Sequence, residues 1–139
     1  MTNRTMAYIV KNQNPLKLPS DATVQQACQH MWDRRVGAVL VTDDDKLVGI
    51  FTGRDAVRTL AEGRPSAGTP LSAVMTAKPD TIPPEATAID ALRRMSDCSY
   101  RHLPIVDGDK VIGIVSRGDF KGLEFDRMEG ETWLWERMA

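Results

Sequence analysis

Two kinds of apolar spacing alternate along this chain. Over residues 24–31, apolar side chains recur at i, i+3, i+4 and i+7, which is the spacing of one buried helical face. Thr23 precedes this stretch and Gln26 follows three residues later, so the pair has the form of a capping box that begins a helix. Residues 38–41 are continuously apolar, as in a strand buried on both faces, and residues 47–51 form a second such run after a polar turn. We therefore predict a helix followed by a two-stranded hairpin.

The whole pattern recurs 64 residues later. The offset that relates Thr23 to Thr87 also relates Asp55 to Asp119, and it needs no gap over residues 15–55. An ungapped run with matching apolar positions indicates duplication of one supersecondary unit. Each copy contains a short extended piece, a helix, two strands and a second helix, and neither copy has enough apolar surface to form a core alone. We therefore expect a mixed α/β (α+β) fold of two β-α-β-β-α repeats that pack with pseudo-twofold symmetry.

The repeat also divides the chain into segments. We expect a first repeat at residues 5–64 and a second at residues 71–123. Residues 61–70 are rich in Gly, Pro and Ser, which predicts an exposed linker. Residues 124–139 have no counterpart in the first copy and carry two tryptophans. We expect them to form a C-terminal helical tail that docks on the domain or on a second subunit.

Composition narrows the classes of function. The 18 Lys and Arg residues balance 19 Asp and Glu residues, so the chain lacks the positive excess of a nucleic-acid-binding surface. No apolar run approaches the roughly 20 residues of a membrane-spanning helix. Residues 1–5 lead into a mixed segment without the apolar core of a signal peptide. The two cysteines lack metal-ligand spacing, and we expect no structural disulfide between them, as is usual in a reducing compartment. We expect a cytoplasmic protein with no nucleic-acid or membrane partner.

The sequence contains few residue patterns that are typical of catalytic sites. The chain has no glycine-rich phosphate loop and no cluster of His, Cys and carboxylates with zinc spacing. Its two histidines leave little room for nucleophile–base pairs. Residues 43–45 are three aspartates, but they lack the spacing of a calcium loop, so we interpret them as a solvated turn. We therefore predict no enzyme activity, no catalytic residue, no metal site and no cofactor.

One motif closes the last strand of each copy. A hydroxyl residue is followed three positions later by aspartate, as Thr52 and Asp55 or as Ser116 and Asp119. A carboxylate can accept two hydrogen bonds from the hydroxyls of a ribose, and the neighbouring hydroxyl and helix N-terminal amides can bind a phosphate. The same pairs also fit plain capping boxes that only begin the second helices, over about residues 55–60 and 119–125. The two roles can coexist.

Further stretches complete a resemblance to a known family. Residues 74–76 read Val-Met-Thr before Pro79, residues 101–107 read Arg-His-Leu-Pro-Ile-Val-Asp, and residues 113–119 read Gly-Ile-Val-Ser-Arg-Gly-Asp. In this order the chain resembles a tandem pair of CBS domains, the modules named after cystathionine β-synthase, over about residues 5–123. Such pairs usually stand beside an enzyme, channel or transporter. The chain contains no such neighbour, so we expect a stand-alone CBS-domain-containing protein.

The first repeat departs from the family pattern in two places. It has Val-Lys-Asn at residues 10–12 where the second has Val-Met-Thr at residues 74–76, and it has Leu40 where the second has Pro104. Asn12 can still form a hydrogen bond, although the hydroxyl of threonine is missing there.

The resemblance implies an adenosine-containing ligand, such as AMP, ADP, ATP or S-adenosylmethionine. In the family, each of two clefts combines the motif of one repeat with early strands of the other. The implied ligand-binding residues of the first cleft are Ser116, Arg117, Asp119, Asn12, Pro15, Lys17, Val36, Gly37 and Ala38. Those of the second cleft are Thr52, Arg54, Asp55, Thr76, Pro79, Thr81, Tyr100, Arg101 and His102. We favour the first cleft, because Gly37 and Ala38 would let an adenine approach the backbone closely.

Two functions remain open at this point. The first is a regulatory module for energy sensing, which binds an adenine nucleotide and modulates an unidentified protein partner. The alternative is a structural dimerisation module whose ligand clefts are vestigial. The resemblance and the apolar helices imply a homodimer in either case. The sequence does not tell which adenosine ligand is preferred, whether one or both clefts are occupied, or which partner is regulated.

Overall fold

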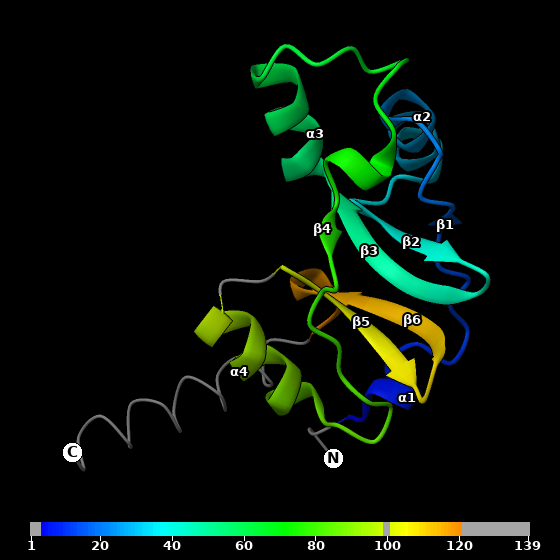
Figure 1. The fold of residues 1–139 in the computed structure, drawn as a ribbon. Helices are drawn as coiled ribbons and strands as arrows, with labels where there is room; N and C mark the ends of the chain where they lie inside the picture. The colour runs from blue at the N-terminus through cyan, green and yellow to red at the C-terminus, as the bar shows by residue number, and fades with distance from the viewer. Residues whose placement is uncertain (1–3, 99–100, 121–139) are drawn as a thin grey trace. The chain divides into compact units, whose positions relative to one another are not determined.

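The computed structural model describes residues 4–98 and 101–120 (Figure 1). The chain divides into two compact units. We call Asn14–Asp80 with Gly108–Val111 the N-repeat unit. We call the described part of Met1–Gln13, Thr81–Asp107 and Ile112–Ala139 the C-repeat unit. The predicted tail over residues 124–139 and the predicted ligand residue Tyr100 lie outside the described residues.

The N-repeat unit contains a four-stranded sheet covered by helices. Its strands lie in the order β1-β2-β3-β4; β1 is parallel to β2, and the other pairs are antiparallel. The helix α2 begins at the capping box of Thr23 and Gln26, as predicted, and buries Ala27 completely. The elements are β1 (Lys17–Leu18), α2 (Val24–Arg34), β2 (Ala38–Asp43), β3 (Lys46–Thr52), α3 (Gly53–Ala61), the 3-10 helix η1 (Leu71–Ala73) and β4 (Thr76–Ala77).

The C-repeat unit is built on a two-stranded sheet of β5 and β6. The extended piece that begins the second repeat is short. Ile82 makes a parallel bridge to Ile105, in which Ile82 N donates to Pro104 O at 3.0 Å and Val106 N donates to Ile82 O at 3.1 Å. The helix α4 begins at a box of Thr87 and Asp90, the counterpart of the box that begins α2. The elements are α1 (Met6–Ile9), α4 (Ala88–Cys98), β5 (His102–Asp107), β6 (Lys110–Ser116, which enters this unit at Ile112) and the 3-10 helix η2 (Arg117–Asp119).

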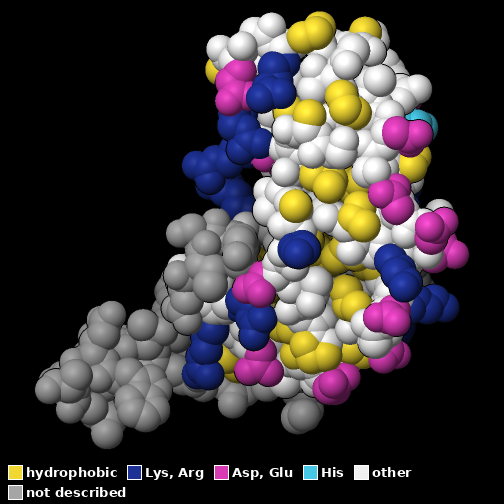
Figure 2. Space-filling model, viewed as in Figure 1, with side chains coloured by type: hydrophobic (Ala, Val, Ile, Leu, Met, Phe, Trp, Pro, Cys, Tyr) yellow, Lys and Arg dark blue, Asp and Glu magenta, His cyan; other side chains and the backbone are white. Residues whose placement is uncertain are grey.

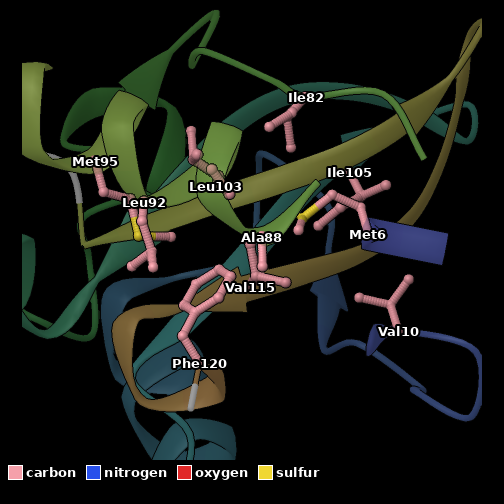
Figure 3. Close-up of a cluster of buried hydrophobic side chains, with 11 residues drawn as sticks. Met6, Val10, Ile82, Ala88, Leu92, Met95, Leu103, Ile105, Val115 and Phe120 are labelled. Atoms are coloured by element: carbon pink, nitrogen blue, oxygen red, sulfur yellow. The ribbon is translucent and has the colours of Figure 1, made fainter. Parts of the chain in front are cut away.

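The compact units are not identical to the sequence repeats. The N-terminal segment of the first repeat packs in the C-repeat unit, where Met6 is fully buried and its N–H donates to Ala86 O at 2.8 Å. Figure 3 shows Met6 and Val10 within the apolar cluster of that unit. Conversely, Leu71 is fully buried in the N-repeat unit and its N–H donates to Ala22 O at 2.8 Å. The first residues of each repeat thus complete the core formed by the other repeat.

The predicted mixed α/β class is confirmed, since helices and sheets occur together in both units. Each unit also has one apolar cluster. In the N-repeat unit it consists of Leu16, Ala22, Val24, Ala27, Met31, Val39, Val41, Phe51, Leu71 and Val74. Figure 2 shows both basic and acidic side chains on the face that it displays, in keeping with a net charge of -1.

The turn between β2 and β3 supports a prediction about stability. Asp44 and Asp45 adopt left-handed backbone angles, with φ of 51° and 61°, whereas the second hairpin has Gly108 at the position of Asp44. Glycine adopts positive φ without a clash of Cβ, so Asp44→Gly is expected to raise the free energy of unfolding by about 0.5–1 kcal/mol. Urea denaturation measures the change. Lys46→Gly, within β3, should do the opposite, and a loss of stability in Asp44→Gly would contradict the turn geometry.

Candidate functional site

The hydroxyl-to-aspartate motif of the C-repeat unit leaves its carboxylate accessible. Strand β6 ends at Ser116, whose N–H donates to Asp119 Oδ2 at 2.7 Å and whose hydroxyl donates to the same oxygen at 3.3 Å. The pair is therefore a capping box, as one interpretation of the sequence predicted. Asp119 is nevertheless exposed. Since both hydrogen bonds use Oδ2, a carboxylate with acceptor capacity faces solvent at the end of β6.

In the matching motif of the N-repeat unit, the aspartate also forms an ion pair. Thr52 N and Thr52 Oγ1 donate to Asp55 Oδ2 at 3.0 and 3.2 Å, as in the other copy. Here Arg58 Nη2 also lies 3.3 Å from Asp55 Oδ1, and Asp55 is only 6% exposed. The guanidinium of Arg58 is held in turn by Val74 O at 2.6 Å. Both oxygens of Asp55 are thus engaged within the protein, and its role in capping α3 is structural.

The small residues predicted for the first cleft lie beside the motif of their own repeat. Ala38 pairs with Thr52 across β2 and β3, and Gly53 N donates to Gly37 O at 3.1 Å. The structure therefore brings these residues to the start of α3. The predicted residues within the N-repeat unit are Pro15, Lys17, Val36, Gly37, Ala38, Thr52, Arg54, Asp55, Thr76 and Pro79.

The other predicted residues that the structure describes belong to the C-repeat unit. Asn12 comes from the N-terminal segment of the first repeat, which packs in this unit. Arg101 directly precedes β5, and His102 is its first residue. Together with Thr81 and the motif residues Ser116, Arg117 and Asp119, they make up the predicted set of this unit.

Sequence reasoning missed two polar residues of the N-terminal segment. Arg4 Nη2 donates to Asp119 O at 2.8 Å, directly at the motif. The side chain of Gln13 donates to Ile114 O at 2.8 Å and accepts from Ile114 N at 2.6 Å. These partners lie 115 and 101 positions away in the chain, so no local pattern points to them.

His102 is electrostatically coupled to the motif in its own unit. Burial lowers the pKa of His102 below its ordinary value of 6.5; the charge of Asp119 raises it, and the charge of Arg101 lowers it. The imidazole of His102 therefore lies within reach of the charges of Asp119 and Arg101, and its protonation state responds to both.

This pKa shift predicts a dependence of stability on pH. A histidine with a lowered pKa in the folded state binds its proton more tightly when the chain is unfolded. The contribution of neutral His102 to the free energy of unfolding is therefore fully present above pH 6.5. It is lost as the pH falls from there through the lowered pKa of His102. His102→Gln should reduce this loss in urea denaturation between about pH 8 and about pH 5. The exposed His30 provides the control His30→Gln, and equal behaviour of both variants would contradict the prediction.

An apolar groove lies at the end of α2 in the N-repeat unit. It has a volume of about 450 Å³ and is lined by Cys28, Met31, Trp32, Arg35, Val36, Gly37 and Gly53. The guanidinium of Arg35 stacks over the Trp32 ring at 4.3 Å from its centroid. Burial raises the pKa of the Cys28 thiol, which disfavours a reactive thiolate.

Neither a metal-binding cluster nor a membrane-spanning helix is found among the described residues. No group of three or more His, Cys, Asp or Glu side chains within residues 4–98 and 101–120 is placed to hold a metal ion. Over the same part of the chain, every helix is too short or too polar to cross a membrane.

The two-unit fold and its paired motifs define a CBS pair, and the family comparison agrees. The family model of the CBS domain matches residues 9–62 and 71–124. The chain therefore belongs to the CBS domain family and contains two copies of the domain, as the resemblance predicted.

Individual relatives support the same assignment. The CBS domain-containing protein YhcV of Bacillus subtilis is 38% identical over 111 residues, which cover 79% of this chain and 76% of YhcV. A protein with CBS domains from Burkholderia ambifaria is 33% identical, with a TM-score of 0.78 over 83% of this chain and 89% of that one. The chain spans only 18% to 19% of the length of the similar Arabidopsis thaliana CBS domain-containing proteins CBSCBSPB1 and CBSCBSPB3, which are 37% and 40% identical to it.

Some structural neighbours were solved with a ligand. A CBS domain protein of Pyrobaculum aerophilum, solved as a complex with AMP, has a TM-score of 0.82 over 91% of this chain and 98% of that one. Its sequence identity of 20% makes this a likeness of fold.

Proposed function

We propose that this chain is a regulatory module that binds an adenosine-containing ligand at the Ser116–Asp119 motif of the C-repeat unit. One observation carries the proposal. The carboxylate of Asp119 is exposed at a strand end, whereas its counterpart Asp55 is buried and paired with Arg58. A carboxylate kept in solvent at a motif of this family is suited to accept hydrogen bonds from two adjacent ribose hydroxyls.

Neighbouring residues supply groups for the rest of a nucleotide. Arg101 and Arg117 carry positive charge that can pair with phosphate oxygens, and the carboxamide of Asn12 can donate and accept hydrogen bonds. We propose these residues, with His102, as the surroundings of the ligand at Asp119. The AMP complex of the Pyrobaculum aerophilum protein is consistent with this class of ligand.

The Thr52–Asp55 motif is proposed as a second, weaker site. Binding there would have to compete with the ion pair between Arg58 and Asp55, which costs affinity. Gly37 and Ala38 next to Thr52 would leave room for an adenine, so the proposed second site combines an accessible backbone with an occupied carboxylate.

A thermal-shift panel of AMP, ADP, ATP, NAD and S-adenosylmethionine tests the proposal. A compound that binds only the folded chain adds about 2.7 kcal/mol of stability at about 100 times its dissociation constant. We expect at least one adenosine compound to raise the midpoint of unfolding. No shift with any adenosine compound would refute the proposed function.

A structural dimerisation module is the second candidate, and exposed apolar side chains favour it. Trp32, Val57 and Leu60 on α2 and α3 are 64%, 66% and 72% exposed, and a second subunit packed on these helices would cover them. Light scattering with and without AMP distinguishes the candidates. Self-association without any ligand response would support the structural module, and a monomer in all conditions would exclude it.

A further inference from the structure

The side chain of Gln13 occupies the backbone edge of β6. Ile114 N donates to Gln13 Oε1 and Gln13 Nε2 donates to Ile114 O, both within 2.8 Å. One carboxamide thus makes the pair of hydrogen bonds that a residue of a neighbouring strand makes in an antiparallel ladder. Both hydrogen bonds are exposed to solvent. The side chain of Gln13 therefore binds the edge of β6, and water can compete with it for the backbone groups of Ile114.

The N-repeat unit covers the corresponding edge with a strand. There Ile50 of β3 pairs with Thr76 of β4 through the backbone. The offset of 64 residues relates Ile50 to Ile114 and Thr76 to Asn12. In the C-repeat unit, the segment that contains Asn12 is not a strand, and the carboxamide of the next residue takes over its hydrogen bonds. The side chain of Gln13 thus does for Ile114 what the backbone of Thr76 does for Ile50 in the other unit.

Gln13 and the proposed ligand motif lie on the same edge of β6. Backbone groups of residues i and i+2 in a strand point to the same side, so Ser116 N lies on the edge that Gln13 covers at Ile114, about 7 Å further along. Ser116 N is the group that binds Asp119. The other end of the same N-terminal segment reaches the motif as well, because Arg4 Nη2 donates to Asp119 O. The segment is therefore fastened on both sides of the motif.

We propose that Gln13 is a positioning residue for the ligand at Asp119. By binding the edge of β6, it holds Asn12 near the Ser116–Asp119 motif and fixes the strand end that presents the carboxylate. The inference rests on the proposed function. Because an exposed carboxamide and not a strand fastens this edge, the loss of Gln13 disturbs the site more than it disturbs the apolar core of the unit.

Titration calorimetry with AMP tests the role of Gln13. We expect Gln13→Ala to weaken AMP binding about tenfold, which corresponds to about 1.4 kcal/mol. Gln13→Glu should weaken it at least as much, because a carboxylate has no N–H to donate to Ile114 O. The matched control is Asp90→Ala, which removes a hydrogen bond to Thr87 N in the same unit but leaves the edge of β6 intact. This control should lower the midpoint of unfolding and leave AMP affinity within about twofold.

Amide hydrogen exchange supplies a readout that a general loss of stability would not give. In Gln13→Ala, the amide of Ile114 should exchange faster, while that of Leu103 in the buried part of β5 keeps its protection relative to the Asp90→Ala control. Equal AMP affinity in Gln13→Ala and the unaltered chain would overturn the positioning role alone. Absence of AMP binding by the unaltered chain would also overturn the positioning role. If no compound of the adenosine panel gives a response, the proposed function itself is wrong.

Discussion

Replacing Asp119 by alanine is expected to weaken AMP binding about a hundredfold, because two charge-assisted hydrogen bonds of about 1.5 kcal/mol each are lost. The carboxylate is exposed, and its hydrogen bonds within the protein are those of an exposed 3-10 turn. The variant should therefore remain folded. Titration calorimetry gives the affinity, and the thermal midpoint without ligand shows whether the fold is retained.

Two controls make this result specific. Asp109→Ala removes an exposed aspartate in the turn between β5 and β6 with the same change of charge, and it should leave AMP affinity nearly unchanged. Asp55→Ala should act mainly on stability, because it removes the cap of α3 and leaves Arg58 without its carboxylate. Asp43 is unsuitable as a control, since its carboxylate binds Ser20 N and Ser20 Oγ at 3.0 and 2.6 Å. If Asp119→Ala and Asp109→Ala bind AMP equally well, Asp119 is not the ribose-binding group.

The regular elements could be predicted because each depends on local spacing. The apolar face over residues 24–31 and the box of Thr23 and Gln26 are properties of neighbouring residues, and they determine where α2 begins. The ungapped repeat then carries the same prediction to α4 and to the hairpin of β5 and β6. The exchange of N-terminal segments could not be predicted, because Met6 and Val10 would read as apolar whichever unit buries them.

The difference between the two motifs was only partly visible in the sequence. Both have a hydroxyl residue and an aspartate at the same spacing, so they appear equivalent as patterns. The distinguishing signal is Arg58, three residues after Asp55, whose counterpart after Asp119 is Gly122. Knowing that Arg58 pairs with Asp55 instead of a ligand required its position in three dimensions, where Val74 O holds the guanidinium. Sequence order alone carries no information about that carbonyl.

Two repeat-related glycines lead to a prediction about the N-terminal segment. A Cβ on Gly113 would lie 2.7 Å from Val10 Cβ and 2.8 Å from Gln13 Oε1. A Cβ on Gly49, the same position in the other repeat, would meet the flexible end of the Met75 side chain instead. Val10 is 4% exposed and belongs to the apolar cluster of its unit, so its Cβ cannot move without its backbone.

Gly113→Ala is therefore expected to lower the free energy of unfolding by about 2 kcal/mol, because the added methyl group overpacks the contact with Val10. Gly49→Ala should cost less than about 1 kcal/mol, since the unbranched side chain of Met75 can adopt another rotamer. Urea denaturation of both variants measures the difference, and Gly118→Ala, whose Cβ would have no neighbour closer than 3.8 Å, is the control for the substitution itself. Equal losses in Gly113→Ala and Gly49→Ala would mean that the segment over residues 10–13 is not held against β6. A selective loss in Gly113→Ala would instead locate the exchanged segment on the strand that presents Asp119, where Gln13 binds it.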